Sequence, residues 1–152
     1  MKKLFILVLP LILVQLVSFH AVADEAIEKC LKSWGTHPFG KNPKFKTLAA
    51  NVKVFGVGKD PIDNDITAEP ALVLVKAAVN VMGGSSYELL NPNGWYCFSA
   101  SVNVMGGLII KAHCEAHLAS ASGDTTVMGS NDSDTKAVTV MGSSKVERVG
   151  CK

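Results

Sequence analysis

The chain has 152 residues, which is enough for one domain of ordinary size and too few for two. It carries 15 Lys and Arg against 13 Asp and Glu, and removing Lys2 and Lys3 with an expected leader leaves 13 of each sign. A neutral chain argues against nucleic-acid binding, which draws most of its affinity from clustered positive charge.

The first 23 residues have the three parts of a secretory signal: a basic start, an apolar run over residues 4–17, and the small residues Ala21 and Ala23 before a polar segment. The alternative is an uncleaved membrane anchor. However, the run is interrupted by Pro10 and is shorter than the roughly 20 residues that a spanning helix needs. We therefore predict that residues 1–23 are a cleavable signal peptide and that the protein is periplasmic or secreted, with no transmembrane anchor after cleavage.

Residues 24–49 are expected to form a helical cap and a linker. Ile27, Cys30, Leu31 and Trp34 follow the spacing of one helical face, and Gly35 stands where the helix would end. We expect this amphipathic helix to cap the open end of the domain that follows. A helix that binds a partner or a membrane surface is the alternative.

The most informative feature is a repeated pentapeptide, V-x-V-[MF]-G. Its five copies begin at residues 52, 79, 102, 125 and 138, at intervals of 27, 23, 23 and 13 residues, and Thr125 replaces the first valine of the fourth copy. Every methionine except the initiator lies in a copy. Repeats at such periods are typical of stacked units, so we predict an all-β fold, a short β-solenoid of about five turns over residues 50–152.

The repeat also predicts where its side chains lie. Because successive side chains of a strand point to opposite faces, the first and third residues would stack as the core, and the middle Lys, Asn or Thr would face away from it. The glycine would sit at a corner, where a positive φ or a close backbone approach excludes a Cβ. The last interval is ten residues short, so that turn should lack a side or be flattened.

Segments between the copies have turn and strand signals of their own. Asn91-Pro92-Asn93-Gly94 predicts a turn before a strand that starts at Trp95. Residues 110–118 alternate between apolar and polar side chains, which predicts another strand.

The motif, the spacing near 23 residues and the turn with Pro and Gly between copies resemble single-stranded right-handed β-helices. Two families share this style of repeat: the bactofilins, which polymerise end to end, and the C-terminal domain of bacterial cell-wall-active antibiotic-response proteins. The resemblance covers about residues 50–149. It implies a right-handed solenoid and assigns no functional residue.

Export would place the cysteines in an oxidising compartment, so they are disulfide candidates: Cys30, Cys97, Cys114 and Cys151. Four cysteines allow three pairings, and the sequence does not choose among them. A zinc site is the alternative, but the chain has no C-x-x-C pair.

Two sets of residues are candidate sites. On one strand, His113, Glu115 and His117 would share a face and could converge on a metal ion; the alternative is a solvated polar face. The second set consists of the residues before the repeat glycines: Phe55, Met82, Met105, Met128 and Met141. These side chains either pack in the core or form an apolar stripe that suits a protein interface or, more remotely, copper(I).

No enzyme signature is present: the sequence has neither a G-x-S-x-G motif nor a phosphate-binding loop of the Walker type. We therefore expect a non-enzymatic envelope protein without a cofactor, acting by self-association or by docking an envelope protein partner. A small periplasmic metal-binding or metal-sensing protein that uses His113, Glu115 and His117 is the alternative.

Overall fold

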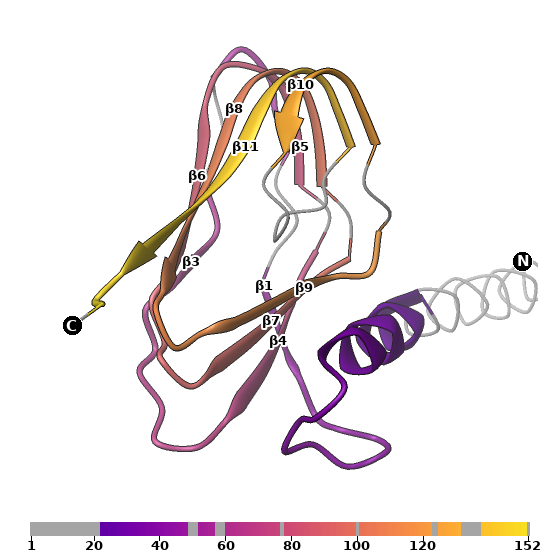
Figure 1. Ribbon diagram of the computed structural model, residues 1–152, viewed down its shortest axis with the longest axis vertical. Helices are drawn as coiled ribbons and strands as arrows, with labels where there is room; N and C mark the ends of the chain where they lie inside the picture. The colour runs from indigo at the N-terminus through magenta and orange to yellow at the C-terminus, as the bar shows by residue number, and fades with distance from the viewer. Residues whose placement is uncertain are drawn as a thin grey trace, which may run out of the picture.

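The computed structural model describes residues 22–48, 52–56, 60–76, 78–99, 101–122, 125–131 and 138–151. In this part of the chain, residues 22–34 form a helix beside two parallel sheets (Figure 1). The helix packs on one face of the smaller sheet, and the other face of that sheet packs on the larger sheet. The predicted signal peptide lies almost entirely outside the described residues.

The smaller sheet has four described strands in the order β1-β4-β7-β9. Its members are β1 (Lys46–Leu48), β4 (Ala71–Val75), β7 (Gly94–Phe98) and β9 (His117–Ser120). β4 and β7 are apolar along nearly their whole length and are buried on both faces, as expected of parallel strands between two covering layers.

The larger sheet has seven described strands. Five of them follow the order β10-β11-β8-β5-β2: β10 (Thr125–Asn131), β11 (Val138–Val149), β8 (Ser101–His113), β5 (Ala78–Met82) and β2 (Val52–Lys53). Beside the second half of β8 lies β6 (Ser85–Leu89), and β6 in turn pairs with β3 (Ile62–Asp63). Among the described residues, the open edges of this sheet are therefore β2 and β3 at one end, and β10 followed by residues 145–149 of β11 at the other.

The expected all-β solenoid of about five turns is wrong. Stacked turns would place the copies of the repeat side by side in chain order, whereas β11, the last copy, lies between β8 and β10. Two parallel sheets with a packed helix make the fold α/β-like rather than plainly all-β.

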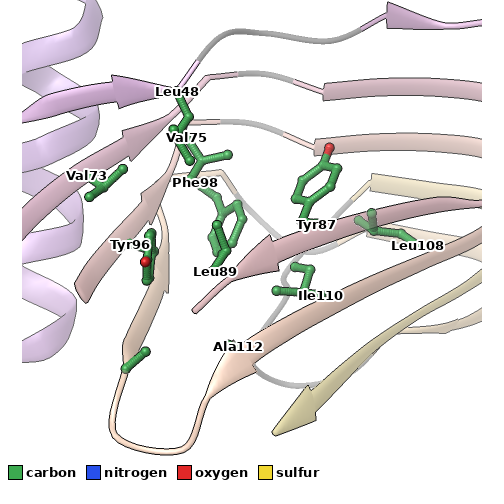
Figure 2. Close-up of a cluster of buried hydrophobic side chains, with 11 residues drawn as sticks. Leu48, Val73, Val75, Tyr87, Leu89, Tyr96, Phe98, Leu108, Ile110 and Ala112 are labelled. Atoms are coloured by element: carbon green, nitrogen blue, oxygen red, sulfur yellow. The ribbon is translucent and has the colours of Figure 1, made fainter. Parts of the chain in front are cut away.

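The main core lies between the two sheets (Figure 2). The smaller sheet contributes Leu48, Val73, Val75, Tyr96 and Phe98, and the larger sheet contributes Tyr87, Leu89, Leu108, Ile110 and Ala112. On the larger sheet these side chains come from the segments that follow the repeat glycines. Buried and less buried side chains alternate along β6 and along the second half of β8. The alternation in the sequence therefore agrees with the burial of Ile110 and Ala112.

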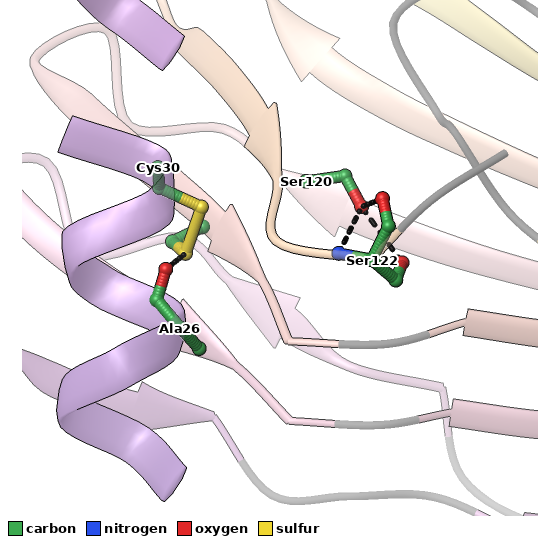
Figure 3. Close-up of a disulfide and its surroundings, with 5 residues drawn as sticks. Ala26, Cys30, Ser120 and Ser122 are labelled. Atoms are coloured by element: carbon green, nitrogen blue, oxygen red, sulfur yellow. Dashed lines mark hydrogen bonds between the residues drawn. A yellow bond between two sulfur atoms is a disulfide. The ribbon is translucent and has the colours of Figure 1, made fainter. Parts of the chain in front are cut away.

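The helix does not cap an end of the sheets. Its apolar residues Ala26, Ile27 and Cys30 pack on the outer face of β4, β7 and β9. The Cys30–Cys97 disulfide joins it to β7, with Cα atoms 5.7 Å apart (Figure 3). The predicted end of the helix is confirmed: Gly35 has a φ of 72°, and its N–H donates to the carbonyl of Leu31.

The repeat copies pair in register, but where the structure describes their side chains the faces are the reverse of those predicted. The middle residues Lys53 and Asn80 are buried, whereas Val54 is 39% exposed and Val81 and Val104 are half-buried. The valines at the third position therefore do not form the core. Alternation placed the two sets on opposite faces correctly, and the tertiary structure decided which face turns inward.

The glycine corner is confirmed. Gly56, Gly83, Gly106 and Gly142 have φ values from 74° to 142°, a region that favours glycine. A Cβ on Gly106 would overlap the carbonyl oxygen of Gly83, because the backbones of neighbouring copies meet closely there. The predicted turn is also present, with the Gly94 N–H donating to the Asn91 carbonyl at 3.1 Å.

Candidate interaction site at the edges of the larger sheet

The β2 edge of the larger sheet carries a buried charge. Lys53 is only 9% exposed, and its Nζ lies 3.1 Å from Oδ2 of Asp60. An inward-pointing lysine on a short edge strand disfavours the addition of another strand, because the added strand would remove the charged group further from water. The first copy of the repeat thus differs from its neighbours at the position where the others have Asn or Thr.

The residue after β2 adds a second obstacle. Phe55 has a φ of 53°, which is rare for a bulky residue, and its side chain is 72% exposed. The Gly56 N–H donates to the Met82 carbonyl at 2.8 Å, so the chain remains attached to β5 through this turn. Within the described part of the chain, β2 therefore offers an incoming strand two residues, Val52 and Lys53, and the bridge at Val54 before this turn.

The β10 edge is different. β10 contains seven residues, Thr-Thr-Val-Met-Gly-Ser-Asn, with no charge and no proline. It pairs in parallel with β11 from Thr125↔Val138 to Asn131↔Ser144, and among the described residues it has no strand on its other side. Unpaired N–H and C=O groups along such an edge are a template for another strand.

The predicted metal ligands are not brought together. His113 ends β8, Glu115 lies in the turn that follows, and His117 begins β9, so the predicted continuous strand breaks at Cys114 and Glu115. His113 Nδ1 accepts a hydrogen bond from the Glu115 N–H at 3.2 Å. In the described part of the chain, no group of three or more His, Cys, Asp or Glu side chains could hold a metal ion.

His117 instead belongs to an aromatic contact on the outer face of the smaller sheet. Its ring stacks on Trp95 with the centroids 3.7 Å apart, and Trp95 also meets Trp34 and Phe39 edge-on. Partial burial, and secondarily the positive charge of Arg148, lower the pKa of His117. The neutral ring is thus favoured in the folded protein.

The predicted methionine stripe is only partly visible. Phe55 is exposed, Met82 is 36% exposed and Met105 is half-buried. The backbone register places Met82, Met105, Met141 and Met128 on successive strands. The side chains of Met128 and Met141 lie outside what the structure describes.

A buried polar cluster joins the two sheets. The Tyr96 hydroxyl donates to Oδ2 of Asp63 at 2.9 Å, and Lys46 Nζ donates to Oδ1 of the same carboxylate at 3.1 Å. Burial, together with the negative charge of Asp63, raises the pKa of the Tyr96 phenol. Asp63 is 2% exposed, and its hydrogen bond with Tyr96 holds β3 against β7.

A second disulfide holds the end of β11. Cys114 in the β8–β9 turn bonds Cys151, with Cα atoms 5.3 Å apart. Beside it, the Arg148 guanidinium donates to the carbonyls of His113 and Ala116. These contacts fix β11 at the position between β8 and β10, and therefore support the β10 edge as well.

Sequence reasoning missed the edge residues because their meaning depends on strand order. Lys53 was visible as the one charged middle residue of the repeat, a signal that could have marked an edge strand. The open side of β10 had no such signal, because the insertion of β11 between β8 and β10 is a tertiary arrangement.

Comparison of the chain with protein-family models, with curated proteins and with solved structures found no match. Both disulfides indicate an oxidising, exported environment. Among the described residues, no helix is long and apolar enough to cross a membrane.

Proposed function

We propose that this chain is an exported, non-enzymatic protein of the cell envelope, located in the periplasm or secreted, that binds another polypeptide by strand addition at the β10 edge. The observation that carries the proposal is the seven-residue uncharged edge of β10, which pairs only with β11 among the described residues. Main-chain hydrogen bonds supply the affinity in such complexes.

Two features support a binding role for the β10 edge in particular. β2 carries a buried lysine and has two residues, so the chain protects this edge strand and leaves β10 without those devices. The Cys114–Cys151 bridge and Arg148 hold β11 in place, so the edge that β10 presents is preorganised.

The test of strand addition uses a labelled peptide with the sequence of residues 101–107, Ser-Val-Asn-Val-Met-Gly-Gly, which is the first part of β8 in this sheet. The full gene is expressed with its leader, and the exported product is purified. We expect the fluorescence anisotropy of the peptide to rise on binding to the protein at high dilution.

The matched variants are Thr126→Lys and Ser33→Lys. Thr126 holds on β10 the register position that Lys53 holds on β2, through the pairs Lys53↔Asn80, Asn80↔Asn103, Asn103↔Thr139 and Thr139↔Thr126. Thr126→Lys should weaken peptide binding at least tenfold. Ser33→Lys adds the same charge to an exposed site on the helix and should leave binding unchanged. Equal binding by both variants would contradict the proposal.

The export part of the proposal has its own measurement. The intact mass of the purified product should correspond to residues 24–152 with all four cysteines oxidised. A product that retains residues 1–23, or that accumulates in the cytoplasm, would contradict it.

A further inference from the structure

We infer that the polypeptide bound at the β10 edge is a second copy of this chain, paired through the two β10 strands, antiparallel, about a two-fold axis. The inference rests on the proposed function, since it names the chain that occupies the edge. It makes the larger sheet continuous across two molecules.

Symmetry selects the antiparallel arrangement. When the same edge strand of two identical molecules meets across a two-fold axis, the strands run in opposite directions, and each contact occurs twice. Antiparallel pairing also has the more favourable hydrogen-bond geometry per residue. The seven residues of β10 thus face the same seven residues of the partner copy.

The composition of β10 suits pairing with itself. A charged residue on a self-paired strand would face, or lie near, the same charge on the partner copy, which is destabilising. The strand from Thr125 to Asn131 contains no charged residue and no proline, so none of its residues either repels its symmetry mate or lacks a backbone donor.

The other end of the sheet explains why the assembly would stop at two chains. Head-to-tail growth would pair β10 of one copy with β2 of the next, in the same parallel register that the repeat copies use within the chain. β2 offers two residues, a buried Lys53 held by Asp60, and the positive φ of Phe55. β10 therefore pairs with β10 of the other copy rather than with β2, and the association closes.

The test combines light scattering after size exclusion with hydrogen exchange on the exported full-chain product. We expect the mass of two chains at micromolar concentration and of one chain on dilution. Thr126→Lys should give one chain at every concentration, and Ser33→Lys should match the wild type. A wild-type mass of one chain throughout the micromolar range would overturn the inference.

Hydrogen exchange needs no substitution, so it remains informative even if Thr126→Lys fails to fold. The β10 amides that point away from β11 should exchange at least tenfold more slowly in the concentrated sample than in the dilute one. A two-chain species in which residues 125–131 exchange as fast as in the dilute sample would place the interface elsewhere and overturn the inference.

The peptide of residues 101–107 separates failure of the inference from failure of the proposed function. If the protein is monomeric but binds the peptide at an edge sensitive to Thr126→Lys, the partner is not a second copy and strand addition stands. If the protein is monomeric and does not bind the peptide, both proposals fail. If the peptide converts the two-chain species into monomers, both are supported.

Discussion

At one end of the larger sheet, β2 has two residues, a lysine turned inward and a phenylalanine with positive φ; at the other end, β10 has seven residues and no charge. Both strands come from copies of the same repeat, and both pair in parallel and in register with their inner neighbours. The difference therefore lies in a few substitutions and in strand length. It shows how copies of one repeat unit can form two unlike edges of one sheet.

Chain order and space order also diverge between these ends. At the β2 end, the copies follow one another in sequence from β2 to β5 to β8. At the β10 end, β11 enters between β8 and β10, so the outermost strand is not the last in the chain. Among the described strands, β10 pairs only with β11. The contacts that hold β11, the Cys114–Cys151 disulfide and the hydrogen bonds of Arg148, therefore also matter for the position of β10.

The largest expected effect on stability comes from the buried disulfide, which should leave the difference between the edges intact. Replacing both Cys30 and Cys97 by Ala should lower the free energy of unfolding by about 4 kcal/mol, because the bridge closes a loop of 67 residues in the unfolded chain. Denaturant titration measures the loss. At low temperature the two-chain species should persist.

The matched control is the other bridge. Replacing Cys114 and Cys151 by Ala opens a loop of 37 residues and also frees the end of β11, the neighbour of β10. This variant should lose slightly less stability but more of the two-chain species. Equal loss of association in both double variants would show that β11 does not support the β10 edge.

The next effect distinguishes the interior of the sheet from its edge. Gly106→Ala should cost more than about 3 kcal/mol, because its Cβ would overlap the Gly83 carbonyl and its φ is 131°. Gly56→Ala at the β2 edge meets no atom within 4 Å and pays only the cost of its positive φ, about 1 kcal/mol.

The midpoint temperature of thermal unfolding should therefore be lower for Gly106→Ala than for Gly56→Ala. Gly107→Ala is the control, since its Cβ has nothing within 4 Å and its φ is not in the positive region. If Gly56→Ala proved as costly as Gly106→Ala, the close stacking of glycines in the interior would not be the cause.

Removing the charge from β2 should make the two edges more alike. The double variant Lys53→Asn with Asp60→Asn places at the edge the residue found in the next copy, without leaving an unpaired carboxylate. We expect a stability change within about 1 kcal/mol and species larger than two chains, measured by light scattering. Lys53→Asn alone should be less stable than the double variant. An unchanged mass would mean that Lys53 does not block the edge.

The smallest effect is a pH dependence at β9, one of the two edge strands described in the smaller sheet. Because the pKa of His117 is lower in the folded protein than the ordinary 6.5, the unfolded chain takes up its proton first as the pH falls. The contribution of neutral His117 to the free energy of unfolding is complete above pH 6.5, and it is lost as the pH falls toward the pKa of His117 in the folded protein. His117→Phe keeps a ring on Trp95 and should remove this part of the pH dependence of denaturant unfolding. A variant that retained the full dependence would assign it to other groups.

Local features were predictable because their causes are local. The end of the helix at Gly35, the turn ending at Gly94 and the positive φ of the repeat glycines all follow from backbone preferences of a few residues. The inward face of the repeat was not predictable in this way. The apolar core of the larger sheet comes from the segments after the glycines, not from the valines of the repeat. The way these segments pack leaves Lys53 and Asn80 on the buried face of the repeat strands.

The candidate sites divide along the same line. The spacing of His113, Glu115 and His117 suggested a metal site. Glu115 instead lies in a turn and the His117 ring stacks on Trp95, so the three side chains do not converge. The edge residues carried no recognisable motif. Their importance depends on which strands have a neighbour on each side, a property of the whole sheet.

By itself, the sequence determined the repeat, its parallel register, its glycine corners and the cysteines suited to an oxidising compartment, since these depend on residue type and spacing. Only the tertiary structure decided the disulfide pairing, the place of the helix on the smaller sheet and the insertion of β11 beside β8. The physical reason is that near-identical strands can pair with one another in several orders at similar local energy. Loop length, packing of the helix and the buried core then select one order, and with it the edge that remains open.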